Sequence, residues 1–268
     1  MKSMVHIICD YAPGDMAWAE VLSAINAVLP EEWHTHLTSV GSFETISTGF
    51  VLAQVALAEP PLRPENLIVF ANCAPRKDLR HARANNEGEG LLYGTTRNNV
   101  GIIAVNSGYS MSFVRDELTQ LWSIKVDHGG SQFRSRDNFP RIVGQAAKDD
   151  RSFLWHQLNP KEHIPDPPAE SIAYVDSFGN FKTTFREGDE VLKKLTPGQR
   201  IKVTIGALIR TATVASGSFN VMEGDLAFAP GSSGHARRFW EIFQRGGSAS
   251  ASFAHPPVGS KITIAPAD

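Results

Sequence analysis

The sequence has few of the features that mark several large classes of protein. Its 268 residues contain only two cysteines, both in apolar runs, which favours buried free thiols over a disulfide. No apolar stretch approaches the roughly 20 residues that a membrane helix needs, and no signal-peptide pattern opens the chain. A formal net charge of -2 argues against the concentrated basic face of a nucleic-acid-binding protein. We therefore expect a cytoplasmic protein with neither membrane nor nucleic-acid partners.

Histidines are present but show no spacing typical of metal ligands. There are nine of them, and none forms a zinc or other metal motif with the two cysteines. We expect no metal site. The hydrophobic content of 42% is enough to bury one large core or two modest ones.

The first part of the chain alternates apolar runs with amphipathic helical patterns. Over residues 1–158 this predicts an α/β sandwich domain with a central sheet. Asp15 is expected to cap a helix that Pro30 stops, and a second helix is expected to begin at Ser42 and to include Phe43. Asp137 is expected to cap a helix that follows it.

Proline and short β-rich runs dominate the rest. Four prolines lie in the nine residues 160–168, so residues 159–169 are expected to form a linker without regular structure. Short apolar runs broken by Gly, Ser and Pro follow it. Residues 170–268 are therefore expected to form a smaller antiparallel β-barrel domain.

Three apolar runs of the first domain end on a short polar residue. Asp10, Asn72 and Asn106 each follow or close such a run. In open sheets with parallel strands, ligands bind beyond the carboxyl ends of the strands, so these side chains are expected to converge on one site. Alternatively, they mark only the turns that begin where strands end.

Residues 174–180 (Tyr-Val-Asp-Ser-Phe-Gly-Asn) combine a carboxylate, an aromatic ring and a carboxamide around one glycine. Asp176, Phe178 and Asn180 could hold a polar, zwitterionic ligand, with Gly179 permitting the bend. The alternative is a hairpin turn whose aspartate is satisfied locally.

Together, the strand-end Asp10, the Phe-Arg-Ser-Arg-Asp stretch at 133–137, the proline linker and the Asp-Ser-Phe-Gly-Asn stretch at 176–180 resemble one family. It is the S-adenosyl-L-methionine hydroxide adenosyltransferases, which include fluorinating and chlorinating enzymes. Residues 241–249 look like its C-terminal stretch. The resemblance implies a homotrimer with S-adenosyl-L-methionine, as substrate and without a cofactor, bound between neighbouring subunits.

The resemblance also implies roles for individual residues. Asp10 would hold the ribose hydroxyls, and Asp176 and Asn180 the methionine amino group and neighbouring atoms. Phe178 would form an aromatic wall, and Ser248 and Ala249 would lie at the adenine edge. The remaining substrate-binding candidates are Phe43, Asn106 and Phe133.

The chain departs from the hydrolysing members where they orient water with Asp, Arg and His. Asn72 stands for the Asp and Arg134 for the His, and neither can act as a general base. Arg76 or Arg80 takes the place of the Arg. Ser135 occupies the position of a halide-contacting Ser, so an anion could lie beside Ser135 and Arg134, unless Arg134 pairs with Glu87 or Glu89.

The sequence therefore predicts an enzyme that displaces methionine from ribose C5′ of S-adenosyl-L-methionine, with water as nucleophile and adenosine as product. Asn72, Arg76, Arg134 and Ser135 are the catalytic candidates. Two alternatives remain. One is a halide-using adenosyltransferase that makes 5′-haloadenosine, and the other is a catalytically inactive protein that binds S-adenosyl-L-methionine or adenosine.

Overall fold

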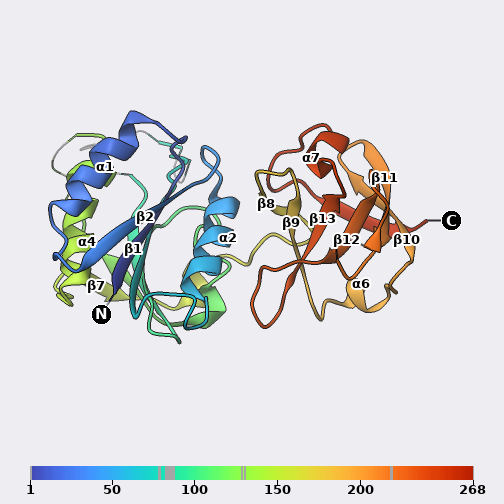
Figure 1. Cartoon of the computed structure of the whole chain (residues 1–268). Helices are drawn as coiled ribbons and strands as arrows, with labels where there is room; N and C mark the ends of the chain where they lie inside the picture. Colours follow the sequence, from blue (N-terminus) through green and yellow to red (C-terminus); the bar gives the residue numbers. More distant parts are fainter. Residues whose placement is uncertain are drawn as a thin grey trace. The chain divides into compact units, whose positions relative to one another are not determined.

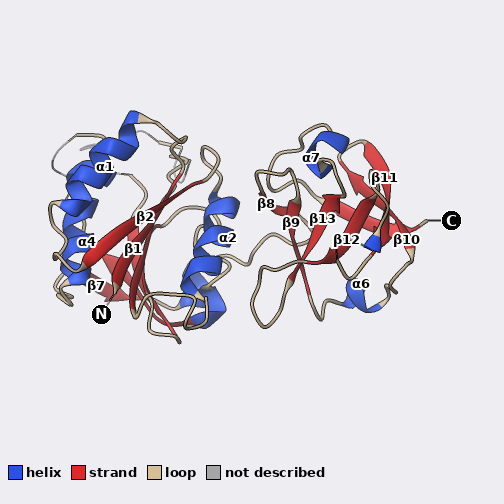
Figure 2. Ribbon diagram, in the orientation of Figure 1, coloured by secondary structure: helices blue, strands red, loops and turns tan. Residues whose placement is uncertain are grey.

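The structure is a computed structural model, which describes residues 2–77, 80–81, 88–127, 129, 131–217 and 220–267. The chain divides into two compact units, Met1–Asp166 and Pro167–Asp268. Each unit is built on one seven-stranded sheet of its own (Figures 1 and 2). The protein is therefore a mixed α/β protein. Within the described ranges, no helix is long and apolar enough to cross a membrane.

The sheet of the first unit has a parallel core and an antiparallel flank. Its order is β2-β1-β3-β5-β4-β6-β7, and β2, β1, β3 and β5 run parallel. The remaining pairs are antiparallel. The strands are β1 Ser3–Cys9, β2 Trp33–Ser39, β3 Asn66–Asn72, β4 Leu91–Thr96, β5 Gly101–Val105, β6 Leu118–Ile124 and β7 Leu154–Gln157.

Helices cover both faces of this sheet (Figure 2). Adjacent residues of β1 point to opposite faces, so Ile7 packs in the core that includes residues of α1 and α4, whereas Ile8 packs in the core that includes residues of α2. Both isoleucines are fully buried. The helical elements are α1 Met16–Asn26, α2 Thr45–Ala56, η1 Arg115–Glu117, α3 Arg134–Asp137, α4 Phe139–Ala147 and α5 Pro160–His163.

Helix starts agree with the sequence in one case and differ in two. The Asp15 side chain accepts a hydrogen bond from the Ala17 N–H at 2.8 Å and caps α1, as predicted. The second helix begins at Thr45, because Phe43 takes a left-handed backbone with φ of 63°. Asp137 does not cap α4; it ends α3, and its carboxylate accepts hydrogen bonds from the N–H and the hydroxyl of Ser131 instead.

His6 is expected to make the stability of this unit depend on pH. Burial, and next the neighbouring His36, lower the pKa of His6 from 6.5 to about 4. The unfolded chain therefore binds a proton at a higher pH than the folded chain does. Stability is expected to fall as pH drops from 6.5 toward 4, by about 2 kcal/mol at pH 5. Urea unfolding of the parent and of His6→Gln across this range checks it, and an unchanged slope in the variant would refute it.

The second unit is a curled half-barrel. Its strand order is β14-β10-β11-β12-β13-β9-β8, and an isolated bridge between Ser171 and Lys261 joins residues next to its two edge strands. Its strand pairs are antiparallel, as expected, except β11–β12, which is parallel and corrects that expectation. The elements are β8 Ile172–Val175, β9 Phe181–Arg186, α6 Glu190–Lys193, β10 Arg200–Ile205, β11 Leu208–Val214, β12 Leu226–Pro230, β13 Phe239–Gln244, α7 Ala249–Ser252 and β14 Ile262–Pro266.

The proline-rich stretch 159–169 is not free of regular structure. It contains α5, whose first residue is Pro160, a position where the missing N–H costs nothing. The Asn159 side chain caps this helix by accepting from the Lys161 N–H at 3.1 Å. The remaining prolines follow α5, and the division between the two units falls among them, after Asp166.

Candidate functional site

Parallel pairing brings the predicted strand-end residues to one edge of the first sheet. Cys9 lies opposite Asn72, and Ala71 lies opposite Ala104, so β1, β3 and β5 end at nearly the same level. Asp10 and Asn106 follow directly. Asn72 is buried, whereas Asn106 is exposed. The side chains of Asp10 and Asn72 are thus the strand-end groups embedded in this edge.

The carboxylate of Asp10 has specific neighbours. Its Oδ2 accepts a hydrogen bond from the backbone N–H of Phe43 at 3.0 Å. Burial, and next the charge of Asp10, raise the pKa of the Cys73 thiol to about 12. Both cysteines are free and buried, as predicted. Cys73 is therefore a neutral donor beside the carboxylate and not a nucleophilic thiolate.

Tyr11 connects two of the catalytic candidates. Its hydroxyl accepts from Asn72 Nδ2 at 2.8 Å and shares a hydrogen bond with Ser135 Oγ at 2.7 Å. Its ring makes edge contacts with Trp18 and Phe133. Burial raises the pKa of Tyr11, so it stays a neutral phenol. The sequence interpretation missed this residue, although its place directly after Asp10 was the available signal.

Replacing Tyr11 with phenylalanine tests this network. The change keeps the ring contacts but removes the acceptor of Asn72 Nδ2 and the partner of the buried Ser135 hydroxyl. We expect a loss of about 1–2 kcal/mol in the free energy of unfolding. Chemical denaturation measures it. A loss below about 0.5 kcal/mol would show that Asn72 and Ser135 find other partners.

Arg134 is engaged by a buried carboxylate. Its Nη1 donates to the Glu89 carbonyl at 3.0 Å, and its Nη2 lies 3.9 Å from Glu89 Oε2. Glu89 is only 3% exposed. The ion-pair alternative is thus confirmed for Glu89, while Glu87 lies outside the described residues. Because Ser135 is buried and bound to Tyr11, the expected anion position beside Ser135 and Arg134 is not supported.

Arg76 supplies its backbone to the same carboxylate. Its N–H donates to Glu89 Oε1, in a backbone conformation with φ of 58°. The Arg76 side chain is exposed, and so is that of Arg80. The structure therefore brings the backbone of Arg76 to Glu89, the partner of Arg134, and leaves the Arg76 side chain exposed.

The stretch 176–180 forms the turn between β8 and β9. Asp176 Oδ1 accepts from the N–H groups of Phe178 and Asn180, both at 3.0 Å, and Oδ2 accepts from Asn180 Nδ2 at 3.0 Å. Burial alone would raise the pKa of Asp176, but these hydrogen bonds and the charge of Lys182 hold it below its usual value. The locally satisfied turn that the sequence left open is what the structure shows.

The two C-terminal candidates, Ser248 and Ala249, serve the structure of the second unit. Ser248 Oγ accepts from the Ala251 N–H at 3.1 Å and caps α7. Ala249 is fully buried in the core of the second unit, so its side chain cannot line a ligand surface. A Cβ on Gly179 would lie 2.1 Å from Ser248 Oγ, which explains why glycine is needed in the turn.

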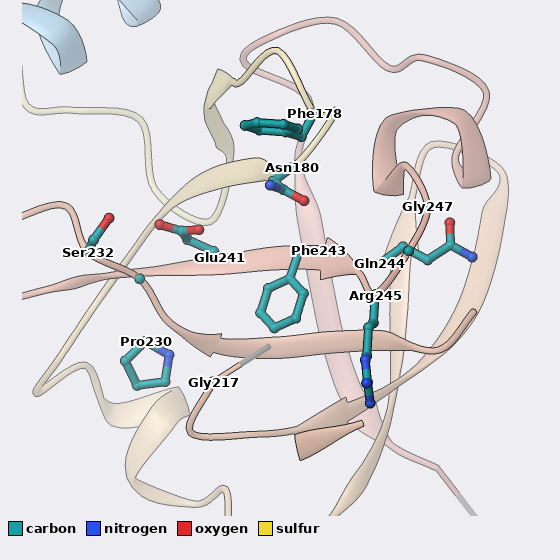
Figure 3. Close-up of a pocket in the computed structure, with 12 residues that line it drawn as sticks. Phe178, Asn180, Gly217, Pro230, Ser232, Glu241, Phe243, Gln244, Arg245 and Gly247 are labelled. Carbon is teal, nitrogen blue, oxygen red and sulfur yellow. The ribbon is translucent and has the colours of Figure 1, made fainter. Parts of the chain in front are cut away.

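A pocket of about 650 Å³ lies beside this turn (Figure 3). Phe178 and Asn180 line it from the turn, and Glu241, Phe243 and Arg245 line it from β13 and the residue after it. Phe178 is 76% exposed. The pocket thus combines aromatic surface with a carboxylate and a carboxamide, a lining typical of small-molecule sites.

The side chains at the edge of the first sheet determine what chemistry the first unit can perform. At the edge of the first sheet, Asn72 and neutral Tyr11 can orient a polar ligand by hydrogen bonds but cannot take a proton at neutral pH. Asp10 can accept hydrogen bonds from hydroxyl groups. Over the described part of the chain, no three His, Cys, Asp or Glu side chains are grouped so that they could hold a metal ion.

No protein-family model matches the chain, and no curated protein does. Solved structures of similar fold include two from thermophilic bacteria. An uncharacterized conserved protein from Thermotoga maritima has a TM-score of 0.75 at 20% identity, covering 98% of this chain and 100% of that chain. A conserved hypothetical protein from Thermus thermophilus has a TM-score of 0.70 at 15% identity, covering 99% and 100%. At these identities the likeness shows a shared fold alone.

Proposed function

We propose that the protein binds S-adenosyl-L-methionine and displaces methionine from ribose C5′ by water, giving adenosine and methionine. The observation that carries the proposal is the Asp10 carboxylate, placed by parallel strands at the sheet edge beside the Phe43 N–H. An ionised carboxylate offers acceptors to both hydroxyls of a ribose diol. The order of motifs that resembles the S-adenosyl-L-methionine hydroxide adenosyltransferases supports the choice of ligand.

The proposed reaction suits groups that orient and do not take protons. The C5′–S bond breaks with its electron pair leaving to the sulfonium sulfur, so methionine departs neutral and needs no acid. A water oxygen forms the new bond to C5′ and releases its proton to solvent. Neutral Tyr11, held by Asn72 and Ser135, would hold such a water by hydrogen bonds. Alignment of the nucleophile is then the main contribution of the protein.

A second function is favoured by a specific observation. Asn72 and Ser135 are both hydrogen-bonded to Tyr11, and Arg134 is paired with Glu89, so three of the catalytic candidates are engaged by other side chains. A protein that binds S-adenosyl-L-methionine or adenosine without turnover needs only Asp10 and the ligand-facing surfaces. The halide-using alternative loses its anion position, because Arg134 pairs with Glu89.

One experiment separates these functions. Purified protein is incubated with S-adenosyl-L-methionine in ¹⁸O-labelled water, with and without chloride, and the products are identified by mass spectrometry. The proposal predicts methionine and adenosine that carries one ¹⁸O at the 5′ oxygen. Binding without product supports the binding protein, and 5′-chloroadenosine supports halide use. Absence of binding overturns the ligand assignment.

The proposal includes the finer architecture that the resemblance implies. This architecture is a closed β-barrel in the second unit and assembly as a homotrimer. The proposed location, the cytoplasm, rests on the composition of the sequence. The bridge between Ser171 and Lys261 supports closure of the sheet at that point. Light scattering during size-exclusion chromatography tests the trimer, which should have three times the mass of the chain.

A further inference from the structure

A buried carboxylate oxygen in the second unit has no hydrogen-bond partner. Glu241 lies on β13 and is only 8% exposed. Its Oε2 binds Lys182 Nζ at 2.6 Å, but its Oε1 is buried without any protein partner. A buried acceptor left unpaired is destabilising, and more so when the group is charged, so such atoms usually have a bound partner.

This carboxylate belongs to the wall of the 650 Å³ pocket. In Figure 3 it is drawn between Ser232 and Asn180, and the rings of Phe178 and Phe243 lie above and below Asn180. Arg245 extends away from it, and the Arg245 Nη1 donates to the Val221 carbonyl at 2.8 Å. No cation other than Lys182 is placed against Glu241 among the described residues.

The local charges favour a cationic ligand. Lys182 serves two carboxylates, because its Nζ also lies 3.5 Å from Asp176 Oδ2. Both oxygens of Asp176 are engaged by hydrogen bonds of its own turn. One ammonium therefore faces two carboxylates, and Glu241 Oε1 is the acceptor that remains. A protonated amine would supply both the missing donor and the missing charge.

We propose that Glu241, and not Asp176, receives the protonated amino group of the ligand in this pocket. The inference rests on the proposed function, in which that group is the amino group of the methionine moiety. The ligand class is an adenosyl amino acid with a free ammonium group. The flanking rings of Phe178 and Phe243 would contact its apolar portion.

Gly231 offers a second, independent variant, because this residue lies against the same carboxylate oxygen. A Cβ on this residue would lie 1.9 Å from Glu241 Oε1. Its own N–H is held by the Phe239 carbonyl at 2.8 Å, so the backbone cannot easily withdraw. Gly231→Ala is therefore expected to displace the carboxylate without removing its charge.

The test compares two thioether ligands that differ in the amino-acid portion. S-adenosyl-L-homocysteine carries it, and 5′-deoxy-5′-methylthioadenosine does not. Calorimetric titration of the full chain is expected to show that Glu241→Gln and Gly231→Ala each weaken the first ligand about tenfold. Both should leave the second within twofold, whereas Asp176→Asn, which disturbs the turn that carries Phe178 and Asn180, should change the affinities of the two ligands equally.

The outcomes separate the two proposals. If Glu241→Gln binds both ligands as the parent does, or weakens both equally, the role of Glu241 is overturned while the proposed function stands. A selective loss in Asp176→Asn instead would assign the amino group to Asp176. If the parent binds neither ligand, the proposed function fails and the role of Glu241 fails with it.

Discussion

Replacing Asp10 with alanine is expected to weaken the binding of S-adenosyl-L-homocysteine about 100-fold. Under the proposed function, the carboxylate accepts charge-assisted hydrogen bonds from the ribose hydroxyls, and losing one such bond costs roughly 1.5–3 kcal/mol. A 100-fold loss corresponds to about 2.7 kcal/mol. Equilibrium titration measures it, with the thioether ligand used in place of S-adenosyl-L-methionine so that turnover does not distort the result.

Two controls distinguish this effect from a loss of structure. Asp10 also accepts from the Phe43 N–H at 3.0 Å, so its removal can disturb the segment before α2. Asp10→Asn keeps one acceptor oxygen for that N–H and is expected to weaken binding about tenfold. Adenine, which has no ribose, should bind parent and variant equally. If Asp10→Ala binds the ribose-containing ligand within twofold of the parent, Asp10 has no ribose role.

The parallel core of the first sheet could be predicted from the sequence because its signals are local. Apolar runs that end on Asp10 and Asn72 alternate with helical patterns, and Asp15 caps α1 as expected. The parallel β11–β12 pair could not be predicted in this way. Short apolar runs look alike whether neighbouring strands run parallel or antiparallel, and the pairing depends on contacts distant in the sequence.

The candidate site was harder to predict because hydrogen-bond partners are set by tertiary packing. Asp176 and Asn180 lie only 4 positions apart across one turn, so their satisfied arrangement was among the expected alternatives. Tyr11 lies 124 positions from Ser135, and no spacing rule connects them. The orphan oxygen of Glu241 is likewise invisible in sequence, since only the fold shows that Lys182 reaches one oxygen and leaves the other.

Arg134→Met is expected to destabilise the protein by about 3 kcal/mol. Methionine fills much of the same space, but it leaves the carboxylate of Glu89 buried without its cation. Breaking a buried ion pair on one side costs roughly 3–5 kcal/mol, and the 3.9 Å separation places this pair at the lower end. Arg134 also lies over the ring of Phe139, at 5.4 Å from its centroid, and methionine loses that contact.

A matched control and a double variant test this assignment. Arg238 pairs with Glu187 at 2.6 Å, but both side chains are partly exposed, so Arg238→Met should cost less than about 1 kcal/mol. Combining Arg134→Met with Glu89→Gln should recover part of the loss, because the buried charge is gone. Urea denaturation of Arg134→Met, Glu89→Gln, the double variant and Arg238→Met measures their free energies of unfolding. The first three give the coupling energy between Arg134 and Glu89.

Arg134→Met also tests whether the role of Arg134 is structural or catalytic. Because its guanidinium is engaged by Glu89, Arg134→Met should keep the parent rate of product formation, or the parent affinity if there is no turnover. The assay is run well below the melting temperature of the variant, so that the loss of stability does not enter. A stable Arg134→Met protein with a rate lowered tenfold or more would return Arg134 to the nucleophile side of the reaction. If Arg134→Met loses no more stability than Arg238→Met, the buried carboxylate of Glu89 does not need Arg134 as its partner.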